Sequence, residues 1–217
     1  MSRTNTTVII DTGCANLSSV RYAFERLTDD VIVTDDQHVI KAAARVVLPG
    51  VGTAGAAMAS LKDKLLIELI QHLTQPVLGV CLGMQIMAEL STEQGGRRID
   101  CQCLGLIPTE ITELDSQEQP LPHMGWNQIT PSDHPLFAGI AGGSYLYFVH
   151  SYRAPLSEYT IAQCQYGETF SAAIAKNNFM GVQFHPEKSA AVGAAILRNF
   201  LSLDSASLNA VLQENNR

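Results

Sequence analysis

The chain has 217 residues and a formal net charge of −7, with 46% hydrophobic and 16% charged residues. This length suits one domain with one core, and the acidic balance argues against nucleic acid as a main partner because phosphate binding needs clustered Lys and Arg. No run of about 18 apolar residues is present, so a membrane span is not expected, and the polar residues 1–7 lack the pattern of a signal peptide. The odd number of cysteines, five, favours reduced thiols in a cytoplasm.

Residues 1–90 alternate between strand and helix patterns. Short apolar runs predict buried strands at 8–10, 31–33, 46–48 and 77–80. Helical spacing predicts a helix over 17–27, a longer helix with one face marked by Met58, Leu61, Leu65, Leu69 and Leu73, and another helix over 82–90. Repeated strand–helix units are typical of a parallel sheet with helices on both faces.

The second half of the chain carries more strand patterns, separated by turns. Strands are predicted near 108–113, 126–130, 145–149, 160–166, 170–175 and 179–184, followed by a last helix near 192–201. We therefore expect one α/β domain over residues 1–217, with a mainly parallel central sheet flanked by helices and with some antiparallel strands.

Gly79-Val80-Cys81-Leu82-Gly83 follows a predicted buried strand and begins a predicted helix. A nucleophile on such a sharp turn needs small neighbours, so the two glycines favour a catalytic role for Cys81. The N-terminus of the following helix would stabilise the thiolate. A buried core cysteine is the alternative, because free Cys is among the most buried residue types.

His185-Pro186-Glu187 offers a base and a group to orient it. Pro186 biases His185 toward extended backbone, in which residues i and i+2 point to the same side. The Glu187 carboxylate could then fix one imidazole tautomer, as nucleophilic catalysis requires. By itself the pair is also compatible with a surface turn that carries His and Glu by chance, and it becomes specific only together with Cys81.

The glycine-rich segment 50–55 allows more than one interpretation. It matches G-x-G-x-x-G between a strand and a helix, as in a dinucleotide-binding turn. However, it follows the third predicted strand, and the next strand ends in Cys81 instead of a ribose-binding acid. We favour an oxyanion hole over a plain structural turn, with backbone N–H groups at Val51, Gly52 and Leu82 facing a developing negative charge.

Three blocks in this order resemble the class I glutamine amidotransferases. They are Pro49-Gly50-Val51-Gly52, residues 79–85, and Gln183-Phe184-His185-Pro186-Glu187. A second set is similar to the glutaminase subunits of imidazole glycerol phosphate synthases, namely residues 122–127, residues 147–152 and Lys188-Ser189. The resemblance covers nearly the whole chain, and residues 122–127 point to this branch of the class.

The resemblance implies that a triad of Cys81, His185 and Glu187 hydrolyses glutamine through a glutamyl thioester. No cofactor and no metal site are expected, because Cys101-x-Cys103 lacks a second pair at metal spacing. The positions that match the family's substrate contacts are Gly52, Gln85, Glu93, His150, Ser151 and Tyr152.

The resemblance also implies an obligate partner, a cyclase subunit with a (βα)8 barrel, in a cytoplasmic heterodimer. The barrel would use the ammonia to make imidazole glycerol phosphate and an aminoimidazole carboxamide ribotide in histidine biosynthesis. The segment before Asn16 departs from the Gly-Pro-Gly or Gly-x-Gly run expected there. Positions that match the family's partner contacts are Asn16, His123, Trp126, Asn127, Tyr147 and Lys188.

The sequence leaves three other functions open. A glutaminase for another synthase is disfavoured by residues 122–127, and a non-catalytic subunit is disfavoured by the complete set of Cys81, His185 and Glu187. The third is a stand-alone cysteine peptidase or glutamyl hydrolase. Glutamate release from glutamine, measured with and without a barrel partner, separates these possibilities.

Overall fold

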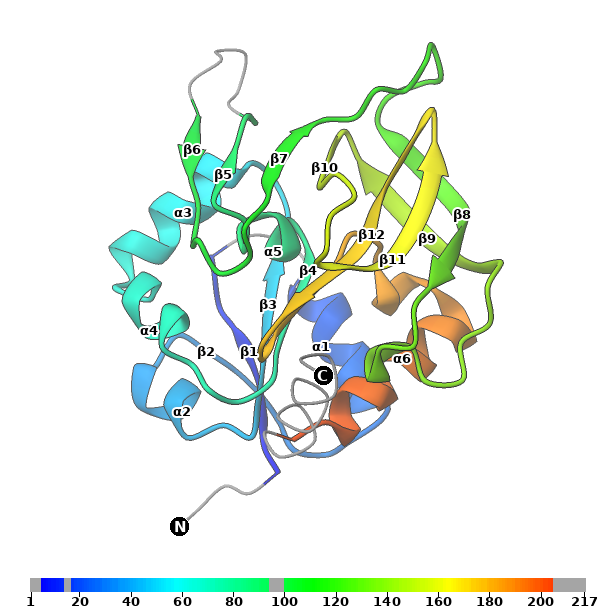
Figure 1. Ribbon diagram of the computed structural model, residues 1–217. Helices are drawn as coiled ribbons and strands as arrows, with labels where there is room; N and C mark the ends of the chain where they lie inside the picture. Colours follow the sequence, from blue (N-terminus) through cyan, green and yellow to red (C-terminus); the bar gives the residue numbers. More distant parts are fainter. Residues whose placement is uncertain (1–4, 14–16, 94–99, 205–217) are drawn as a thin grey trace.

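A sheet of nine strands forms the centre of the computed structural model, which describes residues 5–13, 17–93 and 100–204 (Figure 1). The strand order is β2-β1-β3-β4-β13-β12-β11-β8-β9. The first five strands in this order are mutually parallel and nearly all apolar, as expected for strands covered on both faces. They are β2 (Val31–Thr34), β1 (Thr7–Ile10), β3 (Arg45–Gly50), β4 (Val77–Cys81) and β13 (Phe179–Val182).

The other four strands extend the sheet in antiparallel fashion. They are β12 (Glu168–Lys176), β11 (Thr160–Tyr166), β8 (His123–Pro131) and β9 (Ser144–His150). At the end of the β8–β9 pair, His123 lies directly opposite His150. The predicted α/β fold, with a parallel sheet and antiparallel additions, is confirmed.

A second sheet of four short strands packs beside the first, in the order β10-β7-β5-β6. Ser151 links β9 directly to this sheet, so the chain passes from one sheet to the other at a single residue. The strands are β10 (Tyr152–Arg153), β7 (Glu110–Glu113), β5 (Leu90–Ser91) and β6 (Cys101–Gln102).

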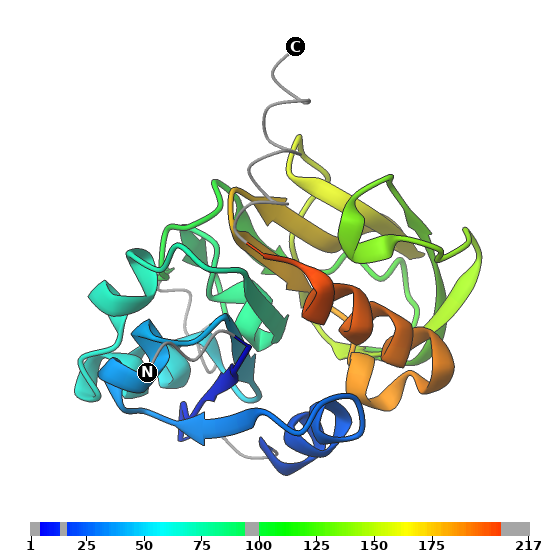
Figure 2. The same cartoon turned by 90° about the horizontal axis from the view of Figure 1, so that it is seen from below.

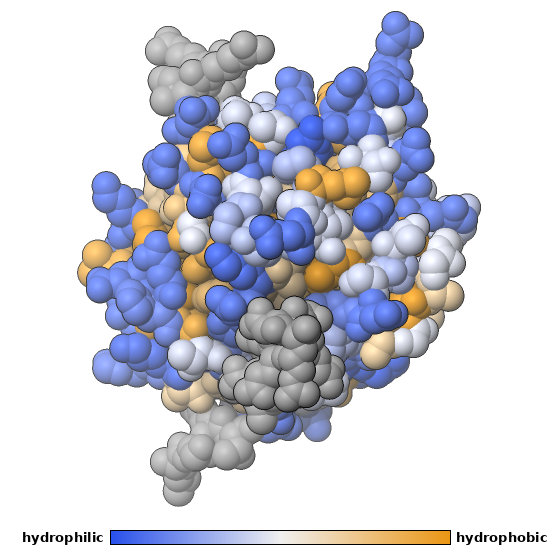
Figure 3. All heavy atoms as spheres, viewed as in Figure 1, coloured by the Kyte–Doolittle hydropathy of each residue, from blue (hydrophilic) through white to orange (hydrophobic). Residues whose placement is uncertain are grey.

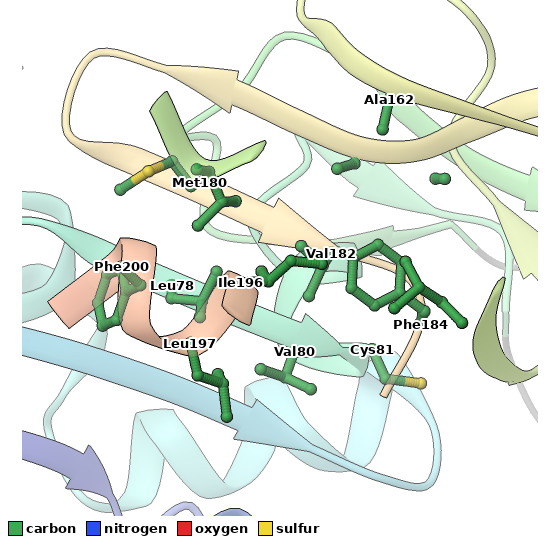
Figure 4. Close-up of a cluster of buried hydrophobic side chains, with 14 of the residues drawn as sticks. Leu78, Val80, Cys81, Ala162, Met180, Val182, Phe184, Ile196, Leu197 and Phe200 are labelled. Atoms are coloured by element: carbon green, nitrogen blue, oxygen red, sulfur yellow. The ribbon is translucent and has the colours of Figure 1, made fainter. Parts of the chain in front are cut away.

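Helices cover both faces of the parallel strands (Figure 2). On one face, α1 (Leu17–Glu25) and α6 (Ala190–Ser202) pack into a core that includes Phe24, Val80 and Phe200. On the other face, α2 (Gln37–Lys41), α3 (Ala54–Asp63) and α4 (Ile67–Gln71) belong to a second core. Figure 4 shows part of the first core, to which both Cys81 and Phe184 belong.

The prediction of one longer helix from the apolar series Met58 to Leu73 is wrong, because the chain forms two helices there, α3 and α4. α3 ends where Leu65 takes a left-handed conformation with φ 57°. The N–H of Leu65 donates to the Lys62 carbonyl at 3.0 Å, and the N–H of Leu66 donates to the Leu61 carbonyl at 2.8 Å. These two bonds form a Schellman C-cap, which is usually made with Gly.

The helix predicted over 82–90 is also shorter than expected. α5 (Leu82–Gln85) is a single turn, and the chain then enters β5 at Leu90. The N–H of Met87 and the N–H of Ala88 make short-range bonds to the Met84 and Gln85 carbonyls, at 3.0 and 3.2 Å. One helical turn has few aligned peptide dipoles, so it supports a thiolate less than the longer predicted helix would.

The parallel half of the sheet gathers three loops at one edge. β3, β4 and β13 are adjacent and parallel, so the segments after Gly50, Cys81 and Val182 all leave at their carboxyl ends. This is the edge at which open parallel sheets bind ligands.

No helix within the described ranges is long and apolar enough to cross a membrane. In Figure 3, polar and apolar residues are interspersed over this face of the molecule.

Candidate active site

Cys81 lies on a sharp turn between β4 and α5, with φ 52° and ψ −110°. A positive φ is strained for a residue with a side chain, and such strain is common where function requires it. The turn needs its glycines. A Cβ at Gly79 would lie 2.6 Å from the Gly83 carbonyl oxygen, and a Cβ at Gly83 would collide with the Leu48 carbonyl oxygen. Gly79 therefore leaves room for the backbone at the start of α5, and Gly83 allows the turn to pack against β3.

His185 and Glu187 pair at the start of the segment after β13. Nδ1 of His185 lies 2.8 Å from Oε1 of Glu187, and both side chains are almost fully buried. Because a carboxylate only accepts, this contact places a proton on Nδ1. His185 itself is extended, with φ −101° and ψ 93°, but Pro186–Lys188 form a short 3-10 helix, η2. The prediction of extended backbone as far as Glu187 is therefore wrong, and the tight turn that begins at Pro186 brings the two side chains together.

The Nε2 atom of His185 is buried and has no hydrogen-bond partner of normal geometry among the described residues. The ring nevertheless lies close to Cys81. Burial lowers the pKa of His185, but the Cys81 and Glu187 side chains outweigh burial and raise that pKa to about 10. The site therefore favours an imidazolium between a sulfur and a carboxylate.

A cavity of about 340 Å³ opens beside Cys81 and His185. This volume is within the range of small-molecule sites. Glu187 lies behind His185 and does not line the cavity. The structure brings together on its walls all the residues predicted for the oxyanion hole and for substrate contacts, namely Val51, Gly52, Leu82, Gln85, Glu93, His150, Ser151 and Tyr152.

The loop after β3 forms one side of the cavity. Gly52 has φ 97°, a conformation that strongly favours glycine, and a Cβ added there would meet no atom within 4 Å. Glu93 reaches across to the start of α3, where this loop ends, since its Oε2 accepts from the N–H of Ala54 at 3.2 Å. Burial raises the pKa of Glu93, against the opposing effect of this hydrogen bond.

The predicted partner-facing residues divide into exposed and buried ones. Trp126 is 52% exposed, and its ring meets that of Tyr147 edge to face at 6.1 Å. The Lys188 ammonium lies 5.8 Å from the centre of the Tyr147 ring. In contrast, His123 is 3% exposed, and Asn127 is partly buried on the same face of β8. Asn16 lies outside the described residues.

Comparison with known proteins agrees with this geometry. The family described as glutamine amidotransferase class-I matches residues 8–203. A protein of Shewanella sediminis named imidazole glycerol phosphate synthase subunit HisH is 79% identical over 210 residues, which cover 97% of this chain and 96% of that one. The chain belongs to the class I glutamine amidotransferases, in their HisH family.

Two further comparisons support this assignment. A Shewanella loihica protein with the same HisH name is 71% identical to this amidotransferase over 206 residues, which cover 93% of this chain and 92% of that one. A glutamine amidotransferase of known structure from Thermotoga maritima has a TM-score of 0.61 at 17% identity, with 98% of this chain and 86% of that one covered. At that identity the likeness concerns the fold alone.

Two groups beside Cys81 in this amidotransferase were not among the residues predicted from sequence. Nε2 of Gln183, a fully buried residue after β13, lies 3.7 Å from Sγ of Cys81. The carbonyl oxygen of Val149 lies 3.9 Å from the same sulfur. A polar residue directly after the apolar run 179–182 was the available signal for Gln183. A backbone carbonyl such as that of Val149 leaves no trace in sequence.

Gln183 also connects Cys81 to Gln85. Nε2 of Gln85 donates to Oε1 of Gln183 at 3.0 Å and to the Tyr152 carbonyl at 3.0 Å. Both amide hydrogens of Gln85 are therefore used.

Among the described residues of this amidotransferase, no group of three His, Cys, Asp or Glu could hold a metal ion. Cys101 and Cys103 are separate from the cavity, and burial raises the pKa of each.

Proposed function

We propose that this chain hydrolyses glutamine at Cys81 and that His185 carries the proton. Glu187 orients the His185 ring and stabilises its protonated form. The observation that carries the proposal is the 2.8 Å contact between His185 Nδ1 and Glu187 Oε1, beside a strained cysteine in one cavity. Nucleophile, base and orienting acid in this arrangement are the requirements for nucleophilic acyl transfer.

The proposed reaction has two halves. The Cys81 thiolate attacks the carboxamide carbon, and a C–S bond forms while the carbonyl becomes a tetrahedral oxyanion. The C–N bond then breaks, and His185 gives its Nε2 proton to the leaving nitrogen, which departs as ammonia. Water attacks the thioester with His185 as base, the C–S bond breaks, and glutamate leaves with the thiolate and imidazolium restored.

Backbone groups on two sides of the cavity would stabilise the oxyanion. The N–H groups of Val51, Gly52 and Leu82 are the proposed donors, since these three residues line the cavity together with Cys81. The amino-acid end of glutamine would lie toward Gln85 and Glu93, where a carboxylate and an amide oxygen suit an ammonium group. The backbone of residues 150–152 would close the pocket.

The relatives are named as subunits of a synthase, which supports a partner for this chain as well. We infer a cyclase subunit with a (βα)8 barrel that receives the ammonia and makes imidazole glycerol phosphate. Its contact surface would include Trp126, Tyr147 and Lys188, which lie near the cavity mouth or are exposed. The odd cysteine count supports a location in the cytoplasm, and the acidic charge argues against nucleic acid or a membrane as a partner.

The test is Cys81→Ala in the complex with its cyclase partner. We expect loss of glutamine-dependent synthesis, because no thioester can form, and retained synthesis from added ammonia, because the ring chemistry needs no thiol. Glutamine hydrolysis that persists in the variant would refute the assignment of the nucleophile. Loss of the ammonia-dependent reaction would instead indicate a damaged complex, and the intact mass and circular dichroism of the variant serve as controls.

A further inference from the structure

A buried histidine pair lies beside the cavity, where β8 and β9 end. Nδ1 of His123 is 3.0 Å from Nε2 of His150. The His123 ring is stacked between two aromatic rings, with centroids 4.1 Å from Tyr166 and 4.9 Å from Phe148. Because His123 is 3% exposed, its side chain is not available to a partner surface, and the interface role expected from the resemblance does not suit this position.

The partners at the two ends fix which nitrogen of each ring carries a proton. Nδ1 of His150 lies 2.8 Å from the Tyr152 carbonyl oxygen, which only accepts, so His150 carries its proton on Nδ1. Nε2 of His150 must then accept from His123 Nδ1. Nε2 of His123 is left as an acceptor, and the amide Nδ2 of Asn127 meets it at 3.2 Å.

Asn127 has a fixed orientation of its own. Its Nδ2 also donates to the Gln165 carbonyl at 2.9 Å, and its Oδ1 accepts from the N–H of Gln128 at 2.8 Å. A neutral imidazole has one donor and one acceptor, which matches what each ring needs here. Burial lowers the pKa of His123 to about 4 and that of His150 to about 3, so both rings are neutral at pH 7.

The other end of this hydrogen-bond chain reaches the cavity. The Tyr152 carbonyl that accepts from His150 accepts a second bond from Nε2 of Gln85 at 3.0 Å. The second Gln85 hydrogen goes to Gln183, so the Gln85 amide is held in one orientation. Its Oε1 receives no hydrogen bond from the described residues, and Gln85 lines the cavity, so this oxygen is an acceptor for a donor on the ligand.

We propose that His123 is a positioning residue, which through His150 and the Tyr152 carbonyl holds Gln85 ready to accept from the ammonium group of glutamine. The hydrogen bonds that link Asn127, His123 and His150 all run in one direction, with Asn127 as the first donor. Asn127 lies on β8, and the opposite face of this strand carries exposed Trp126. This inference rests on the proposed function, which assigns the cavity to glutamine.

The first test uses the unmodified full chain with ¹⁵N-labelled histidine. Long-range ¹H–¹⁵N correlation spectra at pH 7 distinguish the two neutral tautomers and the charged form. The proposal requires His123 and His150 to be neutral with the proton on Nδ1. A spectrum in which either ring is charged, or carries its proton on Nε2, overturns it whatever the enzyme's activity.

The second test is glutaminase kinetics in the complex with the cyclase partner. His123→Phe keeps a stacked ring but removes both hydrogen bonds, so the KM for glutamine should rise about tenfold with kcat within about twofold, as expected when binding is lost equally in the ground state and the transition state. His123→Asn, which can donate near the Nδ1 position, should recover most of the affinity. Tyr166→Phe, which loses only a hydroxyl bonded to the Pro120 carbonyl, should match the unmodified enzyme.

Asn127→Asp keeps the test decisive if His123→Phe does not fold. Asp is nearly isosteric with Asn, but it replaces the donor to His123 with an acceptor. The direction of the hydrogen bonds through His123 and His150 should therefore reverse, and the KM for glutamine should rise as well. Unchanged KM in folded His123→Phe or Asn127→Asp, or a fall in kcat at unchanged KM, overturns the proposal. An unmodified complex that does not hydrolyse glutamine would instead refute the proposed function, and the tautomer result would still stand by itself.

Discussion

Nδ1 of His185 lies 2.8 Å from Oε1 of Glu187, although both side chains are almost fully buried. A buried carboxylate is unfavourable unless a positive or donating group compensates it. The arrangement of Cys81, His185 and Glu187 therefore raises the pKa of His185 despite its burial, and it also compensates the buried carboxylate. Its chemical and energetic consequences can be tested separately.

Glu187→Gln should lower kcat for glutamine hydrolysis by about 100-fold, the order expected for weakened general acid–base catalysis. The amide keeps the shape but removes the charge that supports an imidazolium. The loss should be smaller than in Cys81→Ala, where no thioester can form. The measurement is steady-state kinetics in the complex with the partner. An unchanged rate in a folded variant would exclude Glu187 from the triad.

The stability of the protein should fall as pH rises through the range set by His185. Its pKa is raised from 6.5 to about 10 in the folded chain. The folded state thus binds this proton more tightly, so the contribution is fully present below about pH 6.5 and is lost as pH approaches 10. Urea unfolding at several pH values would measure it. His185→Gln should show a smaller loss over that window, and equal slopes would contradict the account.

Gly83→Ala should destabilise the fold by about 3 kcal/mol or more, because an added Cβ would collide with the Leu48 carbonyl oxygen where the turn packs on β3. The matched control is Gly55→Ala in α3, where an added Cβ meets nothing within 4 Å. That control should be neutral or stabilise the helix by up to about 1 kcal/mol. Denaturant midpoints of the two variants decide the matter, and similar midpoints would contradict the packing argument.

Leu65→Gly should stabilise the protein by about 1 kcal/mol, because glycine adopts a left-handed conformation without the steric cost that Leu65 bears at φ 57°. Little burial is lost, since Leu65 is 75% exposed. Leu65→Ala removes the side-chain atoms beyond Cβ but keeps the Cβ that makes the left-handed conformation unfavourable, so it should give little or no stabilisation. Thermal unfolding of the three proteins provides the comparison, and a less stable glycine variant would be the contrary result.

The isolated chain should be a poor glutaminase, and the cyclase partner with its nucleotide ligand should raise the rate substantially. The loop around Gly52 is the part expected to change, because a peptide next to glycine can rotate at little steric cost. Kinetics of the chain alone and in the complex measure this activation. Full activity in the isolated chain, unaffected by the partner, would show that the site is already formed.

The sequence was sufficient to predict the parallel strands and the cysteine turn, because continuous apolar runs and flanking glycines are local signals. The helix break at Leu65 was not predictable, since leucine gives no sign of a left-handed cap. The two-residue strands such as β10 are too short to show a pattern. The burial of His123 depends on Tyr166 and Phe148, which are distant in sequence, so family position alone suggested a surface role.

The most direct test of the central claim is covalent labelling of the full chain, in complex with its partner, by a glutamine analogue that alkylates thiols. Peptide mass spectrometry would then locate the adduct among the five cysteines. We predict one adduct, on Cys81, which glutamine in excess prevents. Labelling of another cysteine that abolishes glutamine hydrolysis while Cys81 stays unmodified would contradict the assignment of Cys81 as the nucleophile.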